Sequence, residues 1–292
     1  MIDIRSRLNY YTGSNSKITP PINIGTRGYD IPIKLNFEIY RLNYSKIHPN
    51  THYPQDVIRY LSYVKNKDIF IQCGDSSFNG DWPVMVKVRD THRNSSGVIV
   101  NFESTRHLGG MFDHPDPAWG SKCDDCVWRG ADTGWDGDRL RFVKQYGKSH
   151  NVGFSQFVQD ALESPHLYTP EMKKPKLSIQ EMKKYKYLPV IDGNDKSSSL
   201  GWIMASNSIP IMPKPRFHTW VCEPWMEPGV HYVEVKKDWS DLDEKLEWCR
   251  DNDEKCKEIA ENGTLYMMQF MNQTQETYIE KQLSRFCAMQ GD

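Results

Sequence analysis

The 292-residue sequence lacks the signatures that define several large classes of protein. Neither G-x-x-x-x-G-K-[S/T] nor G-x-G-x-x-G occurs, so the usual nucleotide-binding fingerprints are absent. No run of about 18 apolar residues is present, and a membrane-spanning helix is therefore not expected. Lysine and arginine (37) balance aspartate and glutamate (38), and the net charge of −1 argues against binding along a nucleic-acid backbone.

Targeting signals are also missing from the two ends of the sequence. The N-terminal MIDIRSRLNYYTGSNS has no apolar core of a signal peptide, and the C-terminal QGD is not a retention signal. Seven cysteines, an odd number in a chain of this length, fit free thiols in a reducing compartment better than a disulfide framework. These absences predict a cytoplasmic protein.

Short apolar segments alternate with helical patterns along the chain. Strands are predicted over 31–42, 68–73, 83–88, 97–104, 186–193, 208–214 and 231–235. Helices are predicted over 54–66, 137–147, 195–207, 240–252, 253–263 and 264–286. The polar residues 1–30 are expected to form an irregular arm. The alternation predicts an α/β protein with two halves that meet between 106 and 125.

Capping residues set two of the predicted helix ends. Ser240, with Asp243 three residues later, is a variant of the capping box and predicts a helix start. Asn262-Gly263 is typical of a helix C-terminus, because glycine adopts the left-handed conformation that often ends a helix.

Several short motifs overlap in the segment CDDCVWRGADTGWDGDRLRF, which runs from Cys123 to Phe142. Cys123 and Cys126 have the spacing of two zinc ligands, but a structural zinc site needs four, and no second C-x-x-C occurs. His107 and His114 lie upstream without a standard spacing. Two ordinary thiols in a loop are the default interpretation.

Two further motifs in this segment fail on chemical grounds. The tripeptide DTG (132–134) occurs in aspartic proteases, but catalysis there requires a second carboxylate that shares one proton. The acidic residues of DTGWDGD lack the spacing and the terminal bidentate glutamate of a calcium loop. Neither activity is therefore expected.

The segment WRGADTG remains, and it has the groups that a diphosphate needs. Arg129 offers a charged fork, Gly130 and Gly134 let the backbone approach closely, and Thr133 offers a hydroxyl. The predicted helix that follows would add the positive end of its dipole. The alternative is a capped turn with Arg129 in a salt bridge.

The order of longer motifs resembles that of a known family. VKVRD is followed by VWRGADTG, then by KKYKYLPVIDGNDKSSSLGWIMASNSIPIM, and then by EPWMEPGVHYVEVKKDWSDLDEKLEW. This arrangement is similar to glycosyltransferase family 90, which holds the Rumi-type protein O-glucosyltransferases and capsule-associated xylosyltransferases. The resemblance covers residues 83–282. It implies a GT-B fold, with two Rossmann-like domains that face a central cleft.

The resemblance also implies a chemistry. The family uses a UDP-sugar donor, inverts the anomeric carbon and needs no metal or prosthetic group, so protein groups must neutralise the diphosphate. Its general base is the aspartate that closes the VKVRD-like strand, which is Asp90 in this sequence. An inverting displacement needs one such carboxylate to take the acceptor proton. The alternative for Asp90 is an exposed carboxylate paired with Arg89 or Arg93.

Further residues are assigned to the donor by the same resemblance. Arg139 and Arg141 lie in the helix after WRGADTG; one of them is expected to reach the leaving phosphate and the other to be solvated, and Arg139 is the candidate for donor binding. Ser197 and Ser198 are expected to begin the next helix and to contact the diphosphate or ribose. Relatives often carry an arginine in that helix, but this chain has Leu200 there, so the phosphate contact is expected to fall to Arg129 or Lys196.

Glu223, in a loop before Pro224, is the remaining candidate for the donor ribose or sugar; the alternative is a capping or surface acid. The predicted domains are 1–115 on the acceptor side, 116–270 on the UDP-sugar side, and a C-terminal helix over 271–292 that packs back on the first domain.

The predicted function is transfer of xylose or glucose from a UDP-sugar to a hydroxyl of a glycan or protein. Xylose is favoured, because the chain lacks the targeting that suits a secretory O-glucosyltransferase. The missing segments lead us to expect a short stand-alone form, such as a large DNA virus or a microbe would encode for its own glycans. Two alternatives stay open: a sugar- or nucleotide-binding module without catalysis, and a zinc-stabilised interaction protein built around Cys123 and Cys126.

Overall fold

The computed structural model describes residues 1–13, 39–42, 54–65, 67–75, 78, 83–93, 95–102, 112, 115–134 and 136–289. His107, His114 and most of the strand predicted over 31–42 lie outside these residues. The chain forms two compact units. The first unit comprises Met1–Thr105, Arg216–Glu223 and Gln269–Asp292, and the second comprises Arg106–Pro215 and Pro224–Met268. The segment Arg216–Glu223, predicted within the second domain, is thus assigned to the first unit.

A four-stranded sheet forms the centre of the first unit. Its order is β1 (Ile39–Leu42), β2 (Ile69–Gln72), β3 (Val84–Val86) and β5 (Val98–Ile99). The β1 strand runs antiparallel to β2, whereas β2, β3 and β5 are parallel. Every residue of β2, β3 and β5 is buried, as expected for short apolar strands of a parallel sheet. Helix α2 (Pro54–Ser62) lies where the apolar spacing predicts it.

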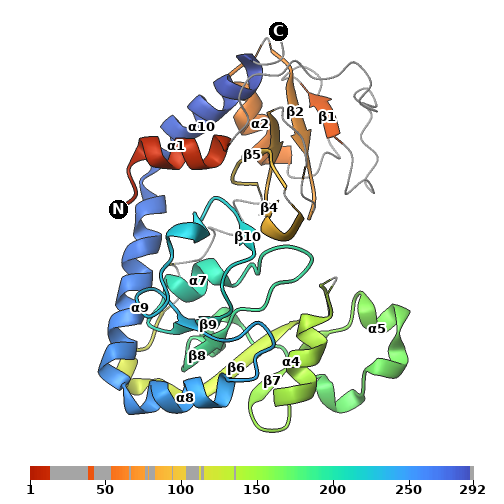
Figure 1. Ribbon diagram of the computed structural model, residues 1–292, viewed down its shortest axis with the longest axis vertical. Coiled ribbons are helices and arrows are strands. Elements are labelled where there is room, and N and C mark those ends of the chain that lie inside the picture. The colour runs from red at the N-terminus through yellow and green to blue at the C-terminus, as the bar shows by residue number, and fades with distance from the viewer. Residues whose placement is uncertain are drawn as a thin grey trace. The chain divides into compact units, whose positions relative to one another are not determined.

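The expected irregular N-terminal arm is wrong over its first residues, which form helix α1 (Ile4–Thr12). The Asp3 carboxylate caps this helix by accepting a hydrogen bond from the Ser6 amide at 3.0 Å. The buried side chains of α1 are Arg7 and Tyr11, so the sequence lacks the aliphatic residues at helical spacing that would have predicted this helix. It lies beside α10 (Gln273–Met289) (Figure 1).

An ion pair joins these two helices. Arg7 Nη1 lies 2.6 Å from Glu276 Oε1, and the Arg7 side chain is 2% exposed. Helix α10 also packs against α2 and β2 within the first unit.

A second, two-stranded sheet completes the first unit. Strand β4 (Arg89–Asp90) pairs antiparallel with β10 (Phe217–His218), with Asp90 opposite Phe217. A short 3-10 helix, η1 (Thr91–Arg93), follows β4 directly. This pairing fixes the segment Arg216–Glu223 to the end of the strand that carries the predicted base.

The second unit is built on a five-stranded, fully parallel sheet. Its strands are β6 (Cys123–Ala131), β7 (Asn151–Gln156), β8 (Tyr185–Pro189), β9 (Ile209–Met212) and β11 (Val233–Glu234), in the order β11-β9-β8-β6-β7. If the five strands are numbered along the chain and the sheet is read from β7 to β11, the order is second, first, third, fourth, fifth. This is the order of a doubly wound α/β sheet. The sequence did not predict β7. It also placed Cys123 in a loop, whereas β6 begins there.

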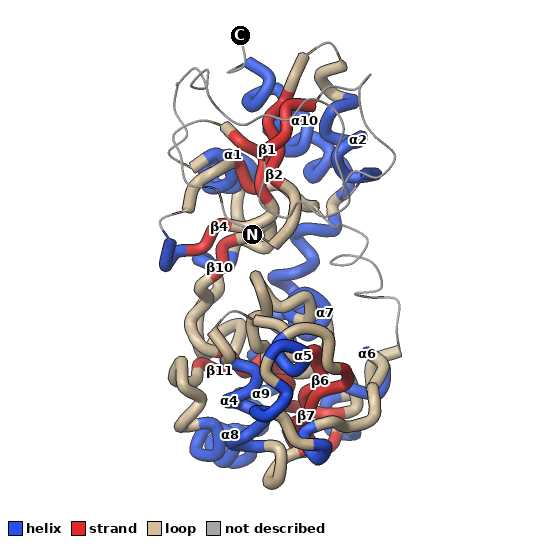
Figure 2. Tube along the Cα trace, turned by 90° about the vertical axis from the view of Figure 1, so that its right-hand side faces the viewer, coloured by secondary structure: helices blue, strands red, loops and turns tan. Residues whose placement is uncertain are grey.

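Helices cover this parallel sheet. They are α4 (Asp138–Tyr146), α5 (Asp160–Glu163), α6 (Ile179–Met182), α7 (Leu200–Met204), α8 (Leu242–Asp251) and α9 (Asp253–Met268). Helix α7 lies on the opposite side of the sheet from α8 in both views (Figures 1 and 2). Aromatic rings of the sheet and helices meet in the core: the Phe142 ring lies 4.7 Å from that of Trp239 and 6.1 Å from that of Trp128.

Two capping predictions in the C-terminal helices are wrong. Helix α8 begins at Leu242 after Asp241, and Ser240 donates to Asp238 instead of capping the helix. Helix α9 continues through Gly263 to Met268. Glycine stands there because a Cβ would lie 3.2 Å from the Met204 carbonyl oxygen, so the residue permits close packing against α7 and does not end a helix.

Candidate active site

The carboxyl ends of β6 and β8 separate at the centre of the five-stranded sheet of the second unit. Strand β6 pairs with β8 through Cys123 and Cys126, and then with β7 from Val127 to Ala131. In a doubly wound sheet of this order, the first and third strands diverge at the topological switch point, where ligands bind in the crevice outside the carboxyl ends. Here that point lies between the residues after Ala131 and the residues after Pro189.

Arg139, on α4, bridges this opening with its guanidinium group. Its Nη1 donates to the Ala131 carbonyl at 3.1 Å, on the β6 side. Its Nη2 donates to the Ile191 carbonyl at 3.0 Å and its Nε to the Asp192 carbonyl at 3.1 Å, on the β8 side. Nη1 also donates to Thr133 Oγ1 at 2.8 Å. Arg139 therefore holds both loops of the crevice in place.

The two loops touch each other directly. The Gly134 amide donates to Asn194 Oδ1 at 3.1 Å, and a Cβ on Gly134 would lie 3.4 Å from the Gly193 carbonyl oxygen. Gly134 has φ +126°, a conformation that side chains disfavour. A Cβ on Gly193 would lie 3.0 Å from both Thr133 Oγ1 and Arg139 Nη2. Glycine is therefore favoured at 134 by the backbone conformation and at 193 by the little space left for a Cβ.

The serines lie in the turn after β8. The Ser197 amide donates to Asp192 Oδ1 at 3.1 Å, and the Ser197 and Ser199 hydroxyls lie 2.8 Å apart. Helix α7 begins at Leu200, so Ser197 and Ser198 precede the helix, whereas the sequence expected them to begin it. Leu200 is buried as the first residue of α7.

Asp132, the aspartate of the DTG tripeptide, has a structural role. Its buried carboxylate accepts hydrogen bonds from the amides of Val158 at 2.6 Å and Ala161 at 2.7 Å, and from that of Gln159. It therefore fixes the start of α5 to the loop after β6.

Arg129 and Gly130 serve the strand that carries them. Arg129 donates to the Pro175 carbonyl at 2.8 Å, and to the Asn151 carbonyl at 2.7 Å and side-chain oxygen at 2.8 Å. In this structure its guanidinium thus ties β6 to β7 and to the segment before α6. A Cβ on Gly130 would lie 2.4 Å from the Trp128 ring, so glycine makes room for that ring.

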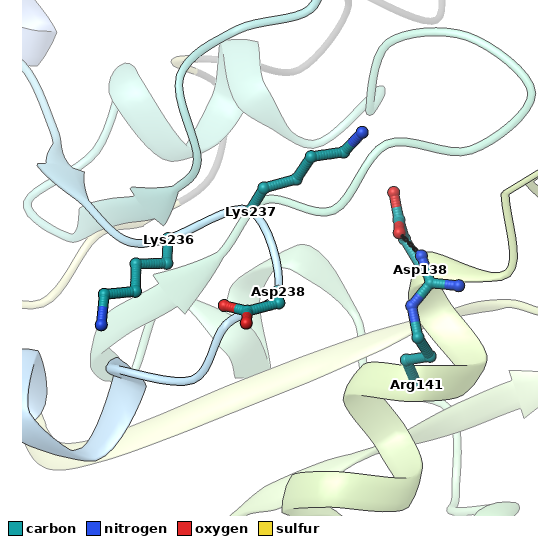
Figure 3. Close-up of a pocket in the computed structure, with 5 residues that line it drawn as sticks. All are labelled: Asp138, Arg141, Lys236, Lys237 and Asp238. Carbon is teal, nitrogen blue, oxygen red and sulfur yellow. Dashed lines mark hydrogen bonds and ion pairs between the residues drawn. The ribbon is translucent and has the colours of Figure 1, made fainter.

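An open hollow of about 430 Å³ lies beside the start of α4, and the described residues that line it are all charged. They are Asp138, Arg141, Lys236, Lys237 and Asp238. Lys237 and Asp138 point toward one another across it, whereas Lys236 points away (Figure 3). Arg141 pairs with Asp138 and is 61% exposed, which matches its expected solvation.

Asp90 lies in the first unit, at the end of β4. Its carboxylate is buried and bound by Arg216: Nε donates to Oδ1 at 2.9 Å and Nη2 to Oδ2 at 2.8 Å. The His92 amide donates to Oδ1 at 3.0 Å, and Arg93 Nε lies 3.4 Å from Oδ2. The alternative, an exposed aspartate paired with Arg89 or Arg93, is therefore wrong about exposure. Of its two expected partners, only Arg93 lies near the carboxylate. Arg89 instead donates to the carbonyls of Tyr10 and Gly97.

Opposing effects act on the pKa of Asp90. Burial by itself raises that pKa, but the hydrogen bonds from Arg216 and from the His92 amide outweigh it and lower the pKa below its ordinary value. The carboxylate is therefore ionised at neutral pH.

Glu223 belongs to the first unit, whereas the other residues predicted to contact the donor belong to the second. Its buried carboxylate accepts hydrogen bonds from the Thr219 amide at 2.6 Å and the Thr219 hydroxyl at 2.5 Å. In this structure Glu223 closes a turn with Thr219, which is neither the helix cap nor the surface acid of the alternative.

The CDDC segment does not bring its thiols together. Cys123 is exposed and Cys126 is buried in the core of the second unit, and none of the seven cysteines, all of which the structure describes, forms a disulfide. Among the described residues, no group of three or more His, Cys, Asp or Glu side chains is placed to hold a metal ion. Within the same residues, no helix is both long and apolar enough to cross a membrane.

Sequence reasoning missed three residues of these sites. Asp192 and Asn194 follow β8 in the turn sequence DGND, whose polar residues after a strand could have drawn attention to them. Arg216 carries no comparable signal, because it lies 126 positions from Asp90.

The fold is thus an α/β fold with a doubly wound parallel sheet, and the loops after β6 and β8 are braced together at its switch point, where proteins of this class typically bind nucleotides. The family model of glycosyl transferase family 90 matches residues 108–290, which is more than half of the chain. The chain therefore belongs to glycosyltransferase family 90.

Individual relatives agree with the family model. The chain is 31% identical over 225 residues to O-glucosyltransferase LpsA of Dichelobacter nodosus, covering 76% of this chain and 67% of LpsA. It is 27% identical over 181 residues to protein O-glucosyltransferase 2 of Danio rerio, covering 61% of this chain and 35% of that protein. It is 37% identical over 102 residues to uncharacterized protein 179R of Invertebrate iridescent virus 6, covering 33% of this chain and 9% of the viral protein. The chain thus spans well under two thirds of the zebrafish and viral relatives.

Proposed function

We propose that this protein is an inverting glycosyltransferase that moves a sugar from a UDP-sugar to a hydroxyl of a glycan or protein, without a metal ion. The observation that carries the proposal is the meeting of two loops, after β6 and after β8, at the switch point of a parallel sheet. Membership of glycosyltransferase family 90 supports a nucleotide-sugar donor for that crevice. A GT-B arrangement of the two units is part of the proposal.

The diphosphate is proposed to bind at the two loops. Thr133 offers a hydroxyl and Gly134 a close backbone approach, with Ser197 and Ser198 on the β8 side. Arg139 positions these groups and adds positive charge behind them. Glu223 is kept as a candidate for the ribose or sugar. Arg129 and Gly130, which this structure engages in β6, are proposed to support the loop and not to touch the phosphate.

The proposed reaction uses Asp90 as the general base. The carboxylate takes the proton of the acceptor hydroxyl while that oxygen attacks the anomeric carbon from the face opposite the leaving group. The bond from the anomeric carbon to the phosphate oxygen breaks, and UDP leaves with the electron pair. The proton on Asp90 then passes to solvent, which restores the base.

The donor sugar is proposed to be glucose or xylose. The sequence analysis favoured xylose, but LpsA and the zebrafish relative are both named O-glucosyltransferases, which supports glucose. The two donors differ by one CH₂OH group, and a pocket discriminates such a difference by only about 1 to 3 kcal/mol. A comparison of both donors on the purified protein is therefore required.

The test is a UDP-release assay against a panel of UDP-sugars with EDTA present, with water or a glycan as acceptor. Release from one donor, unaffected by EDTA and reduced by about 100-fold or more in Asp90→Asn, is the expected result. Asp251→Asn is the matched control, because Asp251 is an exposed aspartate at the end of α8. Failure to bind UDP would overturn the proposal.

The second candidate, a binding module without catalysis, predicts a different pattern. Leu200 supports it, since a buried leucine stands where relatives often carry an arginine. Binding of UDP without turnover of any donor, with or without a glycan acceptor, would select this candidate.

A further inference from the structure

The Asp90 carboxylate is held from one side by a single guanidinium group. Arg216 uses Nε for Oδ1 and Nη2 for Oδ2, the two-point geometry that fixes both the distance and the plane of a carboxylate. Arg216 is also anchored by its own backbone. Its carbonyl accepts from the Thr91 amide at 3.2 Å and from the Thr91 hydroxyl at 2.9 Å. The arginine and the aspartate are thus fixed to each other by side chain and by main chain.

The two oxygens of Asp90 differ in their surroundings. Oδ1 accepts two good hydrogen bonds, from Arg216 Nε at 2.9 Å and from the His92 amide at 3.0 Å. Oδ2 accepts one, from Arg216 Nη2 at 2.8 Å, and has a longer ion pair with Arg93 Nε at 3.4 Å. The Arg93 side chain is 60% exposed, so it can be displaced by an entering group. Oδ2 is therefore the oxygen suited to receive a proton.

We propose that Arg216 is the positioning residue of the general base: it holds Asp90 by both oxygens and presents Oδ2 to the acceptor hydroxyl. This inference rests on the proposed function. It assigns to the transfer reaction a residue that lies 126 positions away in the chain, directly before β10 in the first unit. Arg216 does not touch substrate in this assignment and acts only through Asp90.

A purely structural role is the competing explanation. The same ion pair attaches the segment Arg216–Glu223 to β4, and its loss would destabilise the first unit. A structural role alters the amount of folded protein but not the pH at which the remaining folded enzyme gains its activity. A positioning role alters that pH. The charged groups that face the Asp90 carboxylate are Arg216 and Arg93, which lower its pKa, whereas burial raises it, so removal of Arg216 raises the pKa of the base.

The experiment compares Arg216→Met and Arg216→Lys with wild type in the pH dependence of kcat/KM for UDP release. Arg216→Met removes the fork and its charge, so the acid limb of the profile should move to higher pH and kcat should fall by about 10- to 100-fold, with little change in KM for the donor. Arg216→Lys keeps the charge and loses the fork. It should keep the acid limb close to wild type while kcat still falls.

Arg285→Met is the matched control, because Arg285 is an exposed arginine on α10, in the same unit, and should behave as wild type. Active-site titration with UDP corrects each rate for the folded fraction. If Asp90→Asn is inactive but the acid limb of Arg216→Met is the same as in wild type, the inference about Arg216 is overturned while the proposed base stands. Full activity in Asp90→Asn would overturn the proposed base, and with it the inference.

Discussion

Arg139 Nη1 donates a hydrogen bond of 2.8 Å to Thr133 Oγ1, so the arginine of α4 fixes the hydroxyl of the loop that follows β6. The same guanidinium binds main-chain carbonyls on both sides of the opening between β6 and β8. A side chain that the sequence suggests as a phosphate ligand is therefore a brace for the loops that would surround the phosphate. Its loss should affect stability and UDP binding together.

Replacing Arg139 by methionine tests this brace. The change leaves carbonyls on both loops without their charged donor, and we expect the free energy of unfolding to fall by about 2 to 4 kcal/mol. Urea denaturation measures that loss, and calorimetric titration should show a matching loss of UDP affinity. Arg141→Met is the control: Arg141 lies two residues away, is 61% exposed and pairs with Asp138, so a change within about 0.5 kcal/mol is expected. Equal losses in the two variants would contradict the bracing role.

Gly193→Ala probes how closely the loops approach. The added methyl group would lie 3.0 Å from Thr133 Oγ1 and from Arg139 Nη2. The Arg139 side chain is held by its hydrogen bonds and cannot easily move away from the methyl group. We expect a loss of about 1 to 2 kcal/mol in stability and weaker UDP binding. Gly120 has nothing within 4 Å of an added Cβ, so Gly120→Ala should leave stability unchanged or raise it by up to about 1 kcal/mol. Thermal unfolding of the two variants side by side decides the matter.

Burial should decide the cost of breaking an ion pair in this protein. Glu276→Gln leaves the Arg7 charge, 2% exposed, without its carboxylate, and we expect a loss of about 3 kcal/mol. Glu258→Gln breaks an exposed pair with Lys255, whose side chain is 44% exposed, and should cost less than about 0.5 kcal/mol. Denaturant titrations at low and high salt provide the comparison. A salt-sensitive loss in Glu276→Gln would show that the pair is more hydrated than this structure indicates.

The sequence predicted the elements whose signal is local. Strands β2, β3, β8 and β9 are apolar runs, and α2 and α4 show apolar residues at helical spacing. Strand β7 was missed because NVGFSQ is short, contains glycine and lies at the edge of the sheet. Helix α1 was missed because it buries Arg7 and Tyr11 instead of aliphatic residues. Both misses arise from tertiary partners that no local pattern contains.

The same holds for the candidate site: residues with a local sequence signal were predicted, and their partners distant in the chain were not. WRGADTG indicated a phosphate-binding turn before a helix, and Thr133 and Gly134 do precede α4; the strand before them, β6, was not predicted. Besides Thr133, Arg139 binds main-chain carbonyls of residues up to 53 positions away, and such carbonyls carry no side-chain signature. The pairing of Asp90 with Arg216 likewise depends on the antiparallel contact of β4 with β10, two strands of two residues each. The sequence can propose a base, but only the fold identifies what holds it.

The pH dependence of stability should report the environment of Asp90 without any assay of activity. Because the Arg216 and His92 hydrogen bonds outweigh burial and lower the pKa of Asp90 in the folded protein, the unfolded state binds its proton at higher pH than the folded state does. The stabilisation is therefore present above the unfolded pKa, near 3.8, and is lost as the pH falls through the lower folded pKa. Asp90→Asn removes the titrating group, and we expect it to cost about 2 kcal/mol at pH 7, with the difference from wild type shrinking below about pH 4. Urea unfolding from pH 3 to pH 8 measures this difference, and Asp251→Asn should show no such trend. A difference that grows as the pH falls would mean that burial, and not Arg216, dominates the carboxylate.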